Sequence, residues 1–244
     1  MSITKRQEQI LELLNENRFL TVGRLSELTY TSPSSIRRDL TKLQNMCFIK
    51  RTHGGASLLD QNNQAAPYNN RLSQNIIGKK KIAKKAAALI CDGQSIMLDG
   101  SSTAAFLLPY IAKHKDIHLF TNNMITAINA INYGITTYCI GGSSINHSAV
   151  LGGAQSYKAV SEIHPDILFF SSHSLDINGI ISDPTEEENY LRQLMLKNAK
   201  QSVFLCDSEK FNRRALYTLT SINDVDIAVL DVVWSELKVK CKVM

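Results

Sequence analysis

The sequence contains no apolar run near the roughly 20 residues that a membrane-spanning helix needs, and no secretory signal pattern at its N-terminus. We therefore expect a cytoplasmic protein. Cysteine is also scarce: the five cysteines are odd in number and scattered, and no pair has the spacing of a zinc site or a redox dithiol. We therefore predict that the cysteines are small, buried apolar side chains of a protein in a reducing compartment, and we predict no metal and no cofactor. The five cysteines are Cys47, Cys91, Cys139, Cys206 and Cys241.

The positive charge of the chain is concentrated near the N-terminus. Residues 1–58 hold nine Lys/Arg against five Asp/Glu, a surplus of four, whereas the other 186 residues hold eighteen against seventeen. Four of the five net positive charges thus lie in less than a quarter of the chain. Such an asymmetry is expected when one part of a protein approaches a polyanion.

The basic region contains a segment, residues 32–43, with the pattern of a short amphipathic helix. Ser32 can cap its first turn and Pro33 suits the first helical position. Ile36, Leu40 and Leu43 recur with the helical period and predict one buried face. Arg37 and Arg38 then face outward, where their guanidinium groups match phosphate oxygens and the guanine edge.

Two helices precede this segment, and a β-hairpin follows it. Residues 10–14 and 21–28 are apolar at helical spacing, with Thr21 as an N-cap, and only residues 29–31 separate the second helix from the third. A link this short is typical of a helix-turn-helix. Residues 48–52 and 56–59, which each contain a short apolar stretch, flank His53-Gly54-Gly55, a hairpin signal that predicts a wing. A winged helix that contacts protein instead of DNA is the alternative, and the charge surplus argues against it.

A change of pattern divides the chain. Residues 60–67 are polar, lack hydrophobic periodicity and end in proline, so we predict a winged head over 1–59, a linker over 60–75 and a second domain over 76–244. Six short apolar runs alternate with helical patterns, including helices over 79–89 and 104–111. The runs lie at 95–98, 117–120, 136–140, 167–170, 203–206 and 227–230. This alternation predicts an α/β fold with a mostly parallel sheet covered by helices.

Ligands of such sheets bind beyond the carboxyl ends of the strands, where this sequence is polar and rich in small residues. The loop 99–103 runs into a predicted helix and has the composition of a phosphate cradle, although serine and threonine cap helices in many proteins. Further along the chain, Asp207 and Lys210 form either part of a site or a surface ion pair. We accept two of the acids of Glu186-Glu187-Glu188 as ordinary helix-start residues. The lysines at 79–81 and 84–85 predict a solvated face rather than a phosphate contact.

The motifs of the first sixty residues resemble the winged helix-turn-helix of the DeoR family of bacterial transcriptional regulators. They are Arg6-Gln7-Glu8-Gln9-Ile10, Ile36-Arg37-Arg38-Asp39-Leu40 and Arg51-Thr52-His53-Gly54-Gly55-Ala56. Ser35 stands where the family usually has threonine. The second domain resembles the family's sensor domain, through 99–103, Thr121-Asn122, Gly141-Gly142, Asp166 with Phe169, Glu187-Glu188 and 207–211. Here Arg192 replaces the usual lysine, and Ser174-Leu175-Asp176 replaces a glycine-containing motif.

The resemblance implies a sensor similar in fold to ribose-5-phosphate isomerase, which binds a phosphorylated sugar and controls a carbohydrate operon, most often as a repressor. The alternative is an isomerase-like enzyme that carries a DNA-binding head, because the carboxylates could include a catalytic base. We expect a homo-oligomer, a dimer or a tetramer, on double-stranded DNA. The predicted DNA contacts are Ser34, Ser35, Arg37, Arg38, Lys42, Lys50, Arg51 and His53. The predicted effector site comprises Asp99, Gly100, Ser101, Ser102, Thr103, Thr121, Asn122, Gly141, Gly142, Gly152, Asp176, Glu188, Arg192, Asp207 and Lys210.

Overall fold

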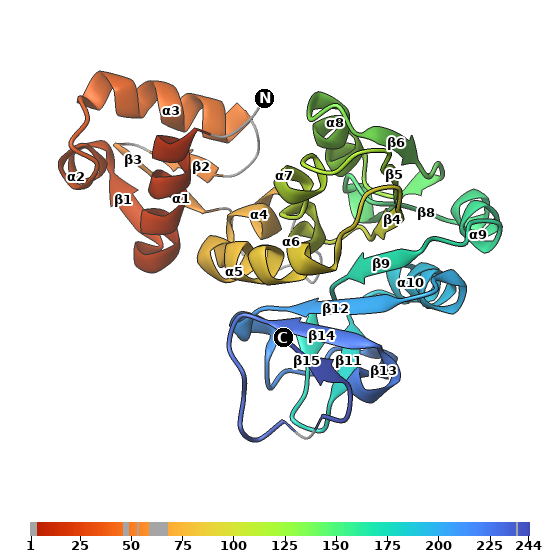
Figure 1. The fold of residues 1–244 in the computed structure, drawn as a ribbon. Helices are drawn as coiled ribbons and strands as arrows, with labels where there is room; N and C mark the ends of the chain where they lie inside the picture. The colour runs from red at the N-terminus through yellow and green to blue at the C-terminus, as the bar shows by residue number, and fades with distance from the viewer. Residues whose placement is uncertain (1–3, 46–48, 53, 59–67, 238) are drawn as a thin grey trace. The chain divides into compact units, whose positions relative to one another are not determined.

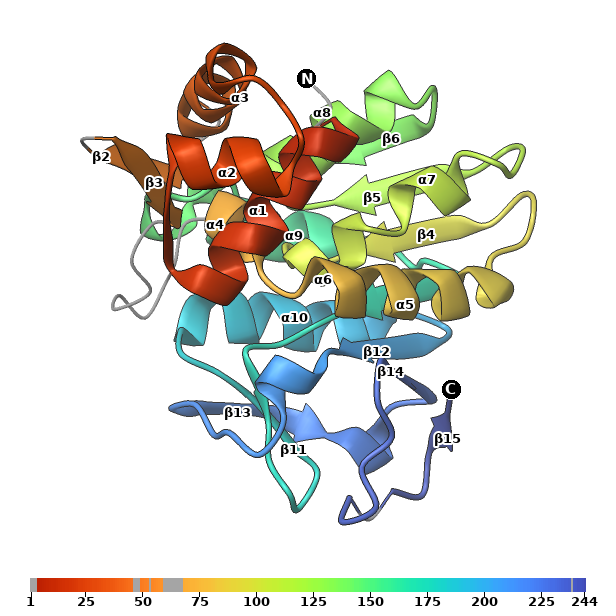
Figure 2. The same ribbon diagram turned by 90° about the vertical axis from the view of Figure 1, so that its left-hand side faces the viewer.

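The computed structural model describes residues 4–45, 49–52, 54–58, 68–237 and 239–244 (Figures 1 and 2). It divides into two compact units, Met1–Ile76 and Ile77–Met244. The helix α4 (Tyr68–Ser73) belongs to the first unit, so part of the predicted linker over 60–75 is helical. Residues 59–67, at the junction of the predicted head and linker, lie outside the described residues.

The first unit is a winged helix-turn-helix, as predicted. Its helices are α1 (Lys5–Asn17), α2 (Val22–Leu28) and α3 (Pro33–Asn45). A hairpin of β2 (Ile49–Thr52) and β3 (Gly55–Leu58) forms the wing, and Gly54 takes a φ of 84° in its turn, a conformation that favours glycine. The short β1 (Phe19–Thr21), which the sequence did not predict, pairs with β3 and completes a sheet of order β1-β3-β2.

Two of the three motifs of the head meet at one buried carboxylate. Asp39 on α3 accepts hydrogen bonds from Arg6 Nε at 2.6 Å and from Gln7 Nε2 at 3.1 Å, both on α1. Gln7 also closes a capping box with Thr4 at the start of α1. The acid of the Ile-Arg-Arg-Asp-Leu motif therefore holds α1 against α3, while Ile36 and Leu40 beside it fill the core.

The second unit is built on a seven-stranded sheet of order β15-β14-β12-β9-β4-β5-β6, in which all pairs of neighbouring strands are parallel. Each of the six predicted runs contributes a strand, which confirms the predicted class. Their bounds are β4 (Ser95–Leu98), β5 (His118–Thr121), β6 (Thr136–Cys139), β9 (Ile167–Phe170), β12 (Ser202–Cys206) and β14 (Ile227–Leu230). The edge strand β15 (Lys242–Val243) was not predicted, because two residues carry no period.

Alternating side chains of the central strands feed two separate apolar layers. Phe169 and Leu205 point into one layer, with α5 (Ile76–Ala86), α6 (Ser102–Ala105), α7 (Leu108–Ile111) and α8 (Met124–Asn132). Phe170 and Phe204 point into the other, with α9 (Ala154–Ser161) and α10 (Glu186–Asn198). The strands are buried on both faces, and this is why they are continuously apolar in sequence.

A second, antiparallel sheet lies in the latter layer and was missed by sequence reasoning. It consists of β10 (Ser174–Leu175), β11 (Ile180–Asp183) and β13 (Tyr217–Ser221). A small hairpin of β7 (Ser143–Ser144) and β8 (Leu151–Gly152) lies between β6 and α9 in the chain. These strands are short, and they lack the apolar runs that identified the parallel strands.

Two aspartates align the amino ends of parallel strands, each by accepting two hydrogen bonds from one serine. Asp166 Oδ2 accepts from the backbone N–H of Ser95 at 2.9 Å and from its hydroxyl at 2.6 Å. Asp226 Oδ2 binds Ser202 in the same way, at 2.7 and 2.8 Å. Asp166 therefore lies at the amino ends of β9 and β4, opposite the edge where ligands are expected.

Three local predictions need correction. Cys91 and Cys139 are exposed and Cys241 is half-buried, so of the described cysteines only Cys206 is a fully buried apolar side chain; Cys47 lies outside the described residues. Lys79 is buried and not solvated, whereas Lys80, Lys81 and Lys84 are exposed. The helix predicted over 104–111 is broken into α6 and α7.

Among the described residues, no helix is long and apolar enough to cross a membrane.

Candidate functional site

The third helix of the head presents a basic face opposite its buried one. Ile36, Leu40 and Leu43 are fully buried, whereas Arg37 and Arg38 are exposed. Ser34 and Lys42 are also exposed, and Ser35 is half-buried. The predicted amphipathic pattern of this segment is therefore confirmed, and its guanidinium groups are accessible.

Hydroxyl groups organise the start of this helix. The Ser32 hydroxyl lies 3.1 Å from the hydroxyls of both Ser34 and Ser35, and it accepts from the Ser35 N–H at 3.4 Å. Arg38 donates to the Ser35 hydroxyl at 3.4 Å, so two of the residues predicted to bind DNA contact each other.

The wing is tied to the same helix. Arg51 on β2 donates to Thr41 Oγ1 at 3.0 Å, and Thr41 donates to the Arg37 carbonyl at 2.9 Å. Arg51 is half-buried, whereas Lys50 beside it is exposed. Sequence reasoning missed Thr41, which lies one turn after Arg37 on the basic side of α3. His53 lies outside the described residues.

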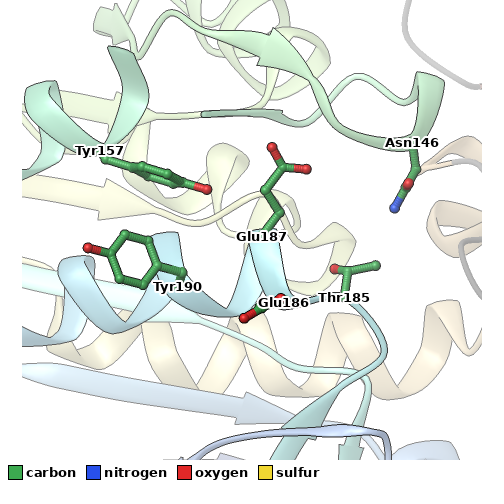
Figure 3. Close-up of a pocket in the computed structure, with 6 residues that line it drawn as sticks. All are labelled: Asn146, Tyr157, Thr185, Glu186, Glu187 and Tyr190. Carbon is green, nitrogen blue, oxygen red and sulfur yellow. The ribbon is translucent and has the colours of Figure 1, made fainter. Parts of the chain in front are cut away.

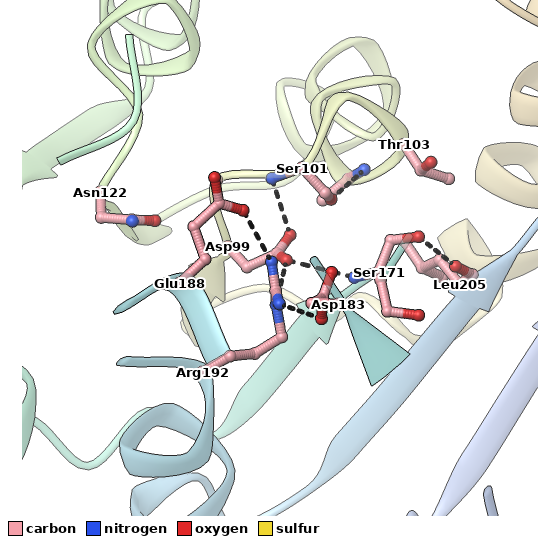
Figure 4. Close-up of polar contacts among 12 residues, drawn as sticks. Asp99, Ser101, Thr103, Asn122, Ser171, Asp183, Glu188, Arg192 and Leu205 are labelled. Carbon is pink, nitrogen blue, oxygen red and sulfur yellow. Dashed lines mark hydrogen bonds and ion pairs between the residues drawn. The ribbon is translucent and has the colours of Figure 1, made fainter. Parts of the chain in front are cut away.

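In the second unit, a buried arginine collects three carboxylates at the carboxyl edge of the sheet (Figure 4). Arg192 Nε donates to Asp99 Oδ2 at 2.9 Å, and its Nη1 donates to Asp183 Oδ2 at 2.6 Å. Glu188, one turn earlier on α10, lies 3.7 Å from Nη2. The Arg192 side chain is only 6% exposed. Three acids around one base leave this cluster with a net charge of −2 when all four groups are ionised.

Burial lowers the pKa of Arg192, but the charges of Asp183, Asp99 and Glu188 outweigh burial and leave its pKa above the ordinary value. The guanidinium is thus permanently charged and fully engaged by protein acids. It holds β4, β11 and α10 together, and its described polar contacts are with carboxylates of the protein.

The loop after β4 is ordered around Asp99. Asp99 Oδ1 accepts from the Ser101 N–H at 3.1 Å, Asp99 Oδ2 accepts from the Ser171 N–H at 3.3 Å, and Ser101 caps α6 by accepting from Ala104 at 3.2 Å. Ser102 and Thr103 are buried in the first turn of this helix. Because α6 has only four residues, it adds little dipole to the predicted phosphate cradle.

Lys210 supplies the positive charge at this loop. Its Nζ donates to Thr103 Oγ1 at 3.1 Å and to Ser171 Oγ at 2.7 Å, and it lies 3.6 Å from Asp207 Oδ2. Ser171 in turn donates to the Leu205 carbonyl at 2.6 Å. The structure therefore brings the predicted loop 99–103 together with predicted Asp207 and Lys210, through a serine that sequence reasoning had not named.

The ends of β5 and β6 meet the same edge through the β7–β8 hairpin. Asn122 Nδ2 donates to the Leu151 carbonyl at 2.8 Å, while Asn122 Oδ1 is buried and has no hydrogen-bond partner among the described residues. Thr121 is buried beside it and accepts from the Asn123 N–H at 3.2 Å. An unsatisfied carbonyl oxygen here is an acceptor that a ligand hydroxyl could use.

The predicted glycines serve close packing at this edge. A Cβ on Gly100 would lie 2.6 Å from Val150, and a Cβ on Gly142 would collide with Ser156 and with the Gly152 carbonyl. Gly152 has no room either, because its Cβ would collide with Ile145. Gly141 has open space around it, and its carbonyl accepts from Ser156. Three of the four glycines are thus explained by loop packing alone.

One predicted residue of the second unit has a local role, and two residues of this unit were missed. Asp176 accepts from the N–H groups of Asn178 and Ile180, both at 2.9 Å, and so shapes the β10–β11 turn. Asp183 and Ser171 are the missed residues. Ser171 directly follows β9, so the strand-end rule would have found it, whereas Asp183 ends an antiparallel strand that the sequence did not predict.

A hollow of about 520 Å³ opens beside the start of α10 (Figure 3). Tyr157 and Tyr190 meet edge to face in it, with ring centroids 4.8 Å apart. Burial and the nearby charge of Glu187 raise the pKa of Tyr157. Glu188, in the same first turn of α10 as Glu187, belongs to the Arg192 cluster. The lining residues are Asn146, Tyr157, Thr185, Glu186, Glu187 and Tyr190. Among the described residues, no cluster of His, Cys, Asp and Glu is arranged to hold a metal ion.

Two family models match different parts of this chain. Residues 6–62 match the DeoR-like helix-turn-helix domain, and residues 74–232 match the DeoR C-terminal sensor domain. Together the two matches cover nearly the whole chain.

Curated relatives align along almost their full length. The transcriptional regulator GolR of Listeria innocua is 32% identical over 93% of this chain and 90% of its own. The L-fucose operon activator of Escherichia coli K12 is 31% identical over 93% and 94%, respectively. A putative aga operon transcriptional repressor of Escherichia coli O157:H7 is 28% identical over 93% and 86%. The relatives thus include both a repressor and an activator.

Among solved structures, a ribose-5-phosphate isomerase of Methanocaldococcus jannaschii aligns with a TM-score of 0.43 and 19% identity, over 57% of this chain and 55% of that one. The delta subunit of eIF2B from Chaetomium thermophilum aligns with a TM-score of 0.50 and 14% identity, over 94% and 71%. At this identity the latter likeness concerns the fold alone.

Proposed function

The chain belongs to the DeoR family of transcriptional regulators, and from this membership we propose that its second unit binds a phosphorylated sugar and thereby controls the affinity of the winged head for operator DNA. It is a DNA-binding regulator with relatives named for sugar operons. The isomerase alternative is not favoured, because the relatives that align with nearly all of this chain are named as regulators and not as enzymes.

DNA recognition is assigned to the basic face of α3. We place Ser34, Ser35, Arg37 and Arg38 in the major groove, where a recognition helix reads base edges. Lys42, Lys50, Arg51 and His53 then contact the phosphate backbone or the minor groove. The observation that supports this is the opposition of two faces on one helix: Ile36, Leu40 and Leu43 are buried, and both arginines are exposed.

The phosphate of the ligand is assigned to the side of Lys210. The ammonium lies beside Thr103, in the first turn of α6, and beside Ser171, which follows β9. A phosphate can accept from the ammonium and from the Thr103 hydroxyl, whereas the Ser171 hydroxyl donates to the Leu205 carbonyl. The Arg192 cluster has a surplus of negative charge, so it repels phosphate but accepts from sugar hydroxyls. Glu188 and Asn122 Oδ1 are the acceptors that we assign to those hydroxyls. Gly100, Ser101 and Ser102 complete the loop that faces the ligand.

Coupling requires that the ligand bind the DNA-competent and the incompetent arrangement with different affinity. We propose a repressor of a carbohydrate operon that its ligand releases, acting as a homo-oligomer on paired half-sites. A ligand that raises DNA affinity instead of lowering it is the alternative, because the relatives include an activator as well as a repressor.

A thermal-shift screen against phosphorylated sugars, each with its unphosphorylated form as control, tests this function. A ligand that binds the folded state stabilises it by about 2.7 kcal/mol at a hundredfold excess over Kd. We expect one sugar phosphate to raise the melting temperature and to change binding to DNA selected from a random pool, while the free sugar does neither. The proposal fails if no sugar phosphate shifts the melting curve, or if one does so without changing DNA affinity.

A further inference from the structure

The two edges of the seven-stranded sheet differ in their protection against pairing with another strand. The edge strand β15 has only two residues. Lys242 in this strand and Lys240 just before it are both exposed. Short length and lysine are common devices that keep a sheet edge from pairing. The opposite edge strand, β6 (Thr136–Cys139), is longer, carries no charge and contains no proline.

The backbone of β6 has groups free to pair. The Ile140 N–H donates to the Thr121 carbonyl of β5 at 2.8 Å. Because backbone groups alternate along a strand, Tyr138 also faces β5, while Thr137 and Cys139 direct their N–H and C=O groups outward. Nothing among the described strands covers this outer side, since β6 ends the strand order.

Apolar side chains flank this edge on both faces of the sheet. On one face α8 packs beside β6 (Figures 1 and 2). Met124, Ile128 and Ile131 are exposed and recur at helical spacing, so they form a stripe on the outer side of α8. Ile128 and Ile131 are 58% and 61% exposed, whereas Ala127 and Ala130 of the same helix are buried. On the other face Tyr138, 46% exposed, stacks on Phe120 with ring centroids 4.7 Å apart.

This whole region is free of formal charge. Residues 117–157, which include β5, α8, β6 and the β7–β8 hairpin, contain no Asp, Glu, Lys or Arg. A charged partner would lose the hydration of its ionised groups here without gaining an ion pair. A second copy of the chain brings the same uncharged surface, so a self-pairing contact buries apolar area on both sides without repulsion.

From these observations we propose that α8 and β6 form the self-association surface of this protein. A two-fold axis perpendicular to the sheet places β6 antiparallel to β6 of a second copy and α8 against α8, so that one sheet continues through both copies. This inference rests on the homo-oligomer of the proposed function and names its surface. It needs no ligand and no DNA.

Charged substitutions in the stripe test the surface. We expect the wild-type protein to have at least twice the 27.2 kDa mass of one chain by light scattering, and the double variant Ile128→Lys/Ile131→Lys to have half the wild-type mass. The matched control is Leu216→Lys/Val233→Lys, at two other exposed apolar residues, which keeps the wild-type mass. Circular dichroism and a melting curve establish that each variant is folded.

Cross-linking of the native sequence gives a second test that does not depend on the folding of a lysine variant. Cys139 is exposed on the proposed surface, and Cys91 is exposed outside it. A short bismaleimide should link two copies, and Cys139→Ser should abolish the covalent dimer while Cys91→Ser leaves it. A monomeric wild type overturns both the oligomer and this surface. An oligomer that survives the double lysine variant and yields no Cys139-dependent dimer overturns the surface alone.

Discussion

Arg192 on α10 donates to Asp99 at the end of β4 at 2.9 Å, across 93 positions of the sequence. Through Asp183 the same guanidinium also holds the end of β11. One side chain thereby joins the parallel sheet, the small antiparallel sheet and the helix that lines the hollow. In the proposed function Arg192 is therefore a positioning residue, which together with Asp99 orders the groups that we propose bind the ligand.

Removal of this arginine should destabilise the second unit strongly. Arg192→Met leaves Asp99, Asp183 and Glu188 without their shared cation, and breaking a buried ion pair costs about 3–5 kcal/mol. Urea unfolding measures the loss. Arg214→Met is the control, because Arg214 is 65% exposed and lies 4.0 Å from Asp176, a pair worth less than about 1 kcal/mol. Equal stability of the two variants would contradict the role assigned to Arg192.

Replacement of Lys210 should weaken ligand binding more than it weakens the fold. Lys210→Met removes the ammonium beside Thr103, and a hydrogen bond to a charged group is worth about 1.5–3 kcal/mol, or roughly 10- to 100-fold in affinity. Titration with the sugar phosphate found in the thermal-shift screen measures this. Lys158→Met, at an exposed position on α9, should bind like the wild type. If Lys210→Met binds equally well, the phosphate lies elsewhere, and Glu187→Gln then tests the hollow of Figure 3.

The arginines of α3 should contribute to sequence preference. We expect Arg38→Ala to lose about 1–3 kcal/mol of binding to selected DNA and to relax preference at one base pair. Lys42→Ala should weaken binding evenly across sequences and lower the salt dependence by about one ion. Fluorescence anisotropy at several salt concentrations measures both effects, with Arg214→Ala as the control outside the head. Unchanged affinity of Arg38→Ala would remove this residue from the interface.

Asp39 should matter for the stability of the head and not for DNA contact. Asp39→Leu removes the acceptor that Arg6 and Gln7 share at 2.6 and 3.1 Å and leaves the buried Gln7 amide unsatisfied. The expected loss is about 1–3 kcal/mol. Glu27→Leu breaks the exposed pair with Arg24 and should cost less than about 1 kcal/mol. Thermal unfolding followed by circular dichroism distinguishes the two, and similar losses would refute the buried role of Asp39.

Acid should weaken the hydrogen bonds that Asp166 accepts at the amino ends of β4 and β9. The hydrogen bond from Lys200, followed by those from Ser95, holds the pKa of Asp166 below its usual value. Since the folded pKa lies below the unfolded one, near 3.9, Asp166 stabilises the fold above about pH 4, and this contribution is lost as the pH falls further.

The stability difference between the wild type and Asp166→Asn should therefore be largest near neutral pH and shrink below about pH 4. Chemical unfolding at a series of pH values measures it, with Glu236→Gln at an exposed position as the control. A difference that grows on acidification would contradict the assigned direction.

Patterns with a clear period or a strong local signal were predictable from the sequence. The central strands β4, β9, β12 and β14 are mainly apolar because helices or a second sheet cover both of their faces, and the wing turn depends on Gly54. β1 and the sheet of β10, β11 and β13 were not predictable, because strands of two to five residues with mixed polarity have no distinctive period. Asp183 was missed for the same reason.

The sequence by itself determined the two-part architecture, the recognition helix with its outward arginines, and the polar strand ends that converge on one edge. These properties follow from local periodicity and from the rule that parallel strands end together. Only the tertiary structure decided what each polar residue does there. Arg192 is occupied by three acids, Lys210 is directed to Thr103, and Asp176 is used in a turn. The physical reason is that charge pairing and burial depend on side chains far apart in the chain, whose distances no local pattern encodes.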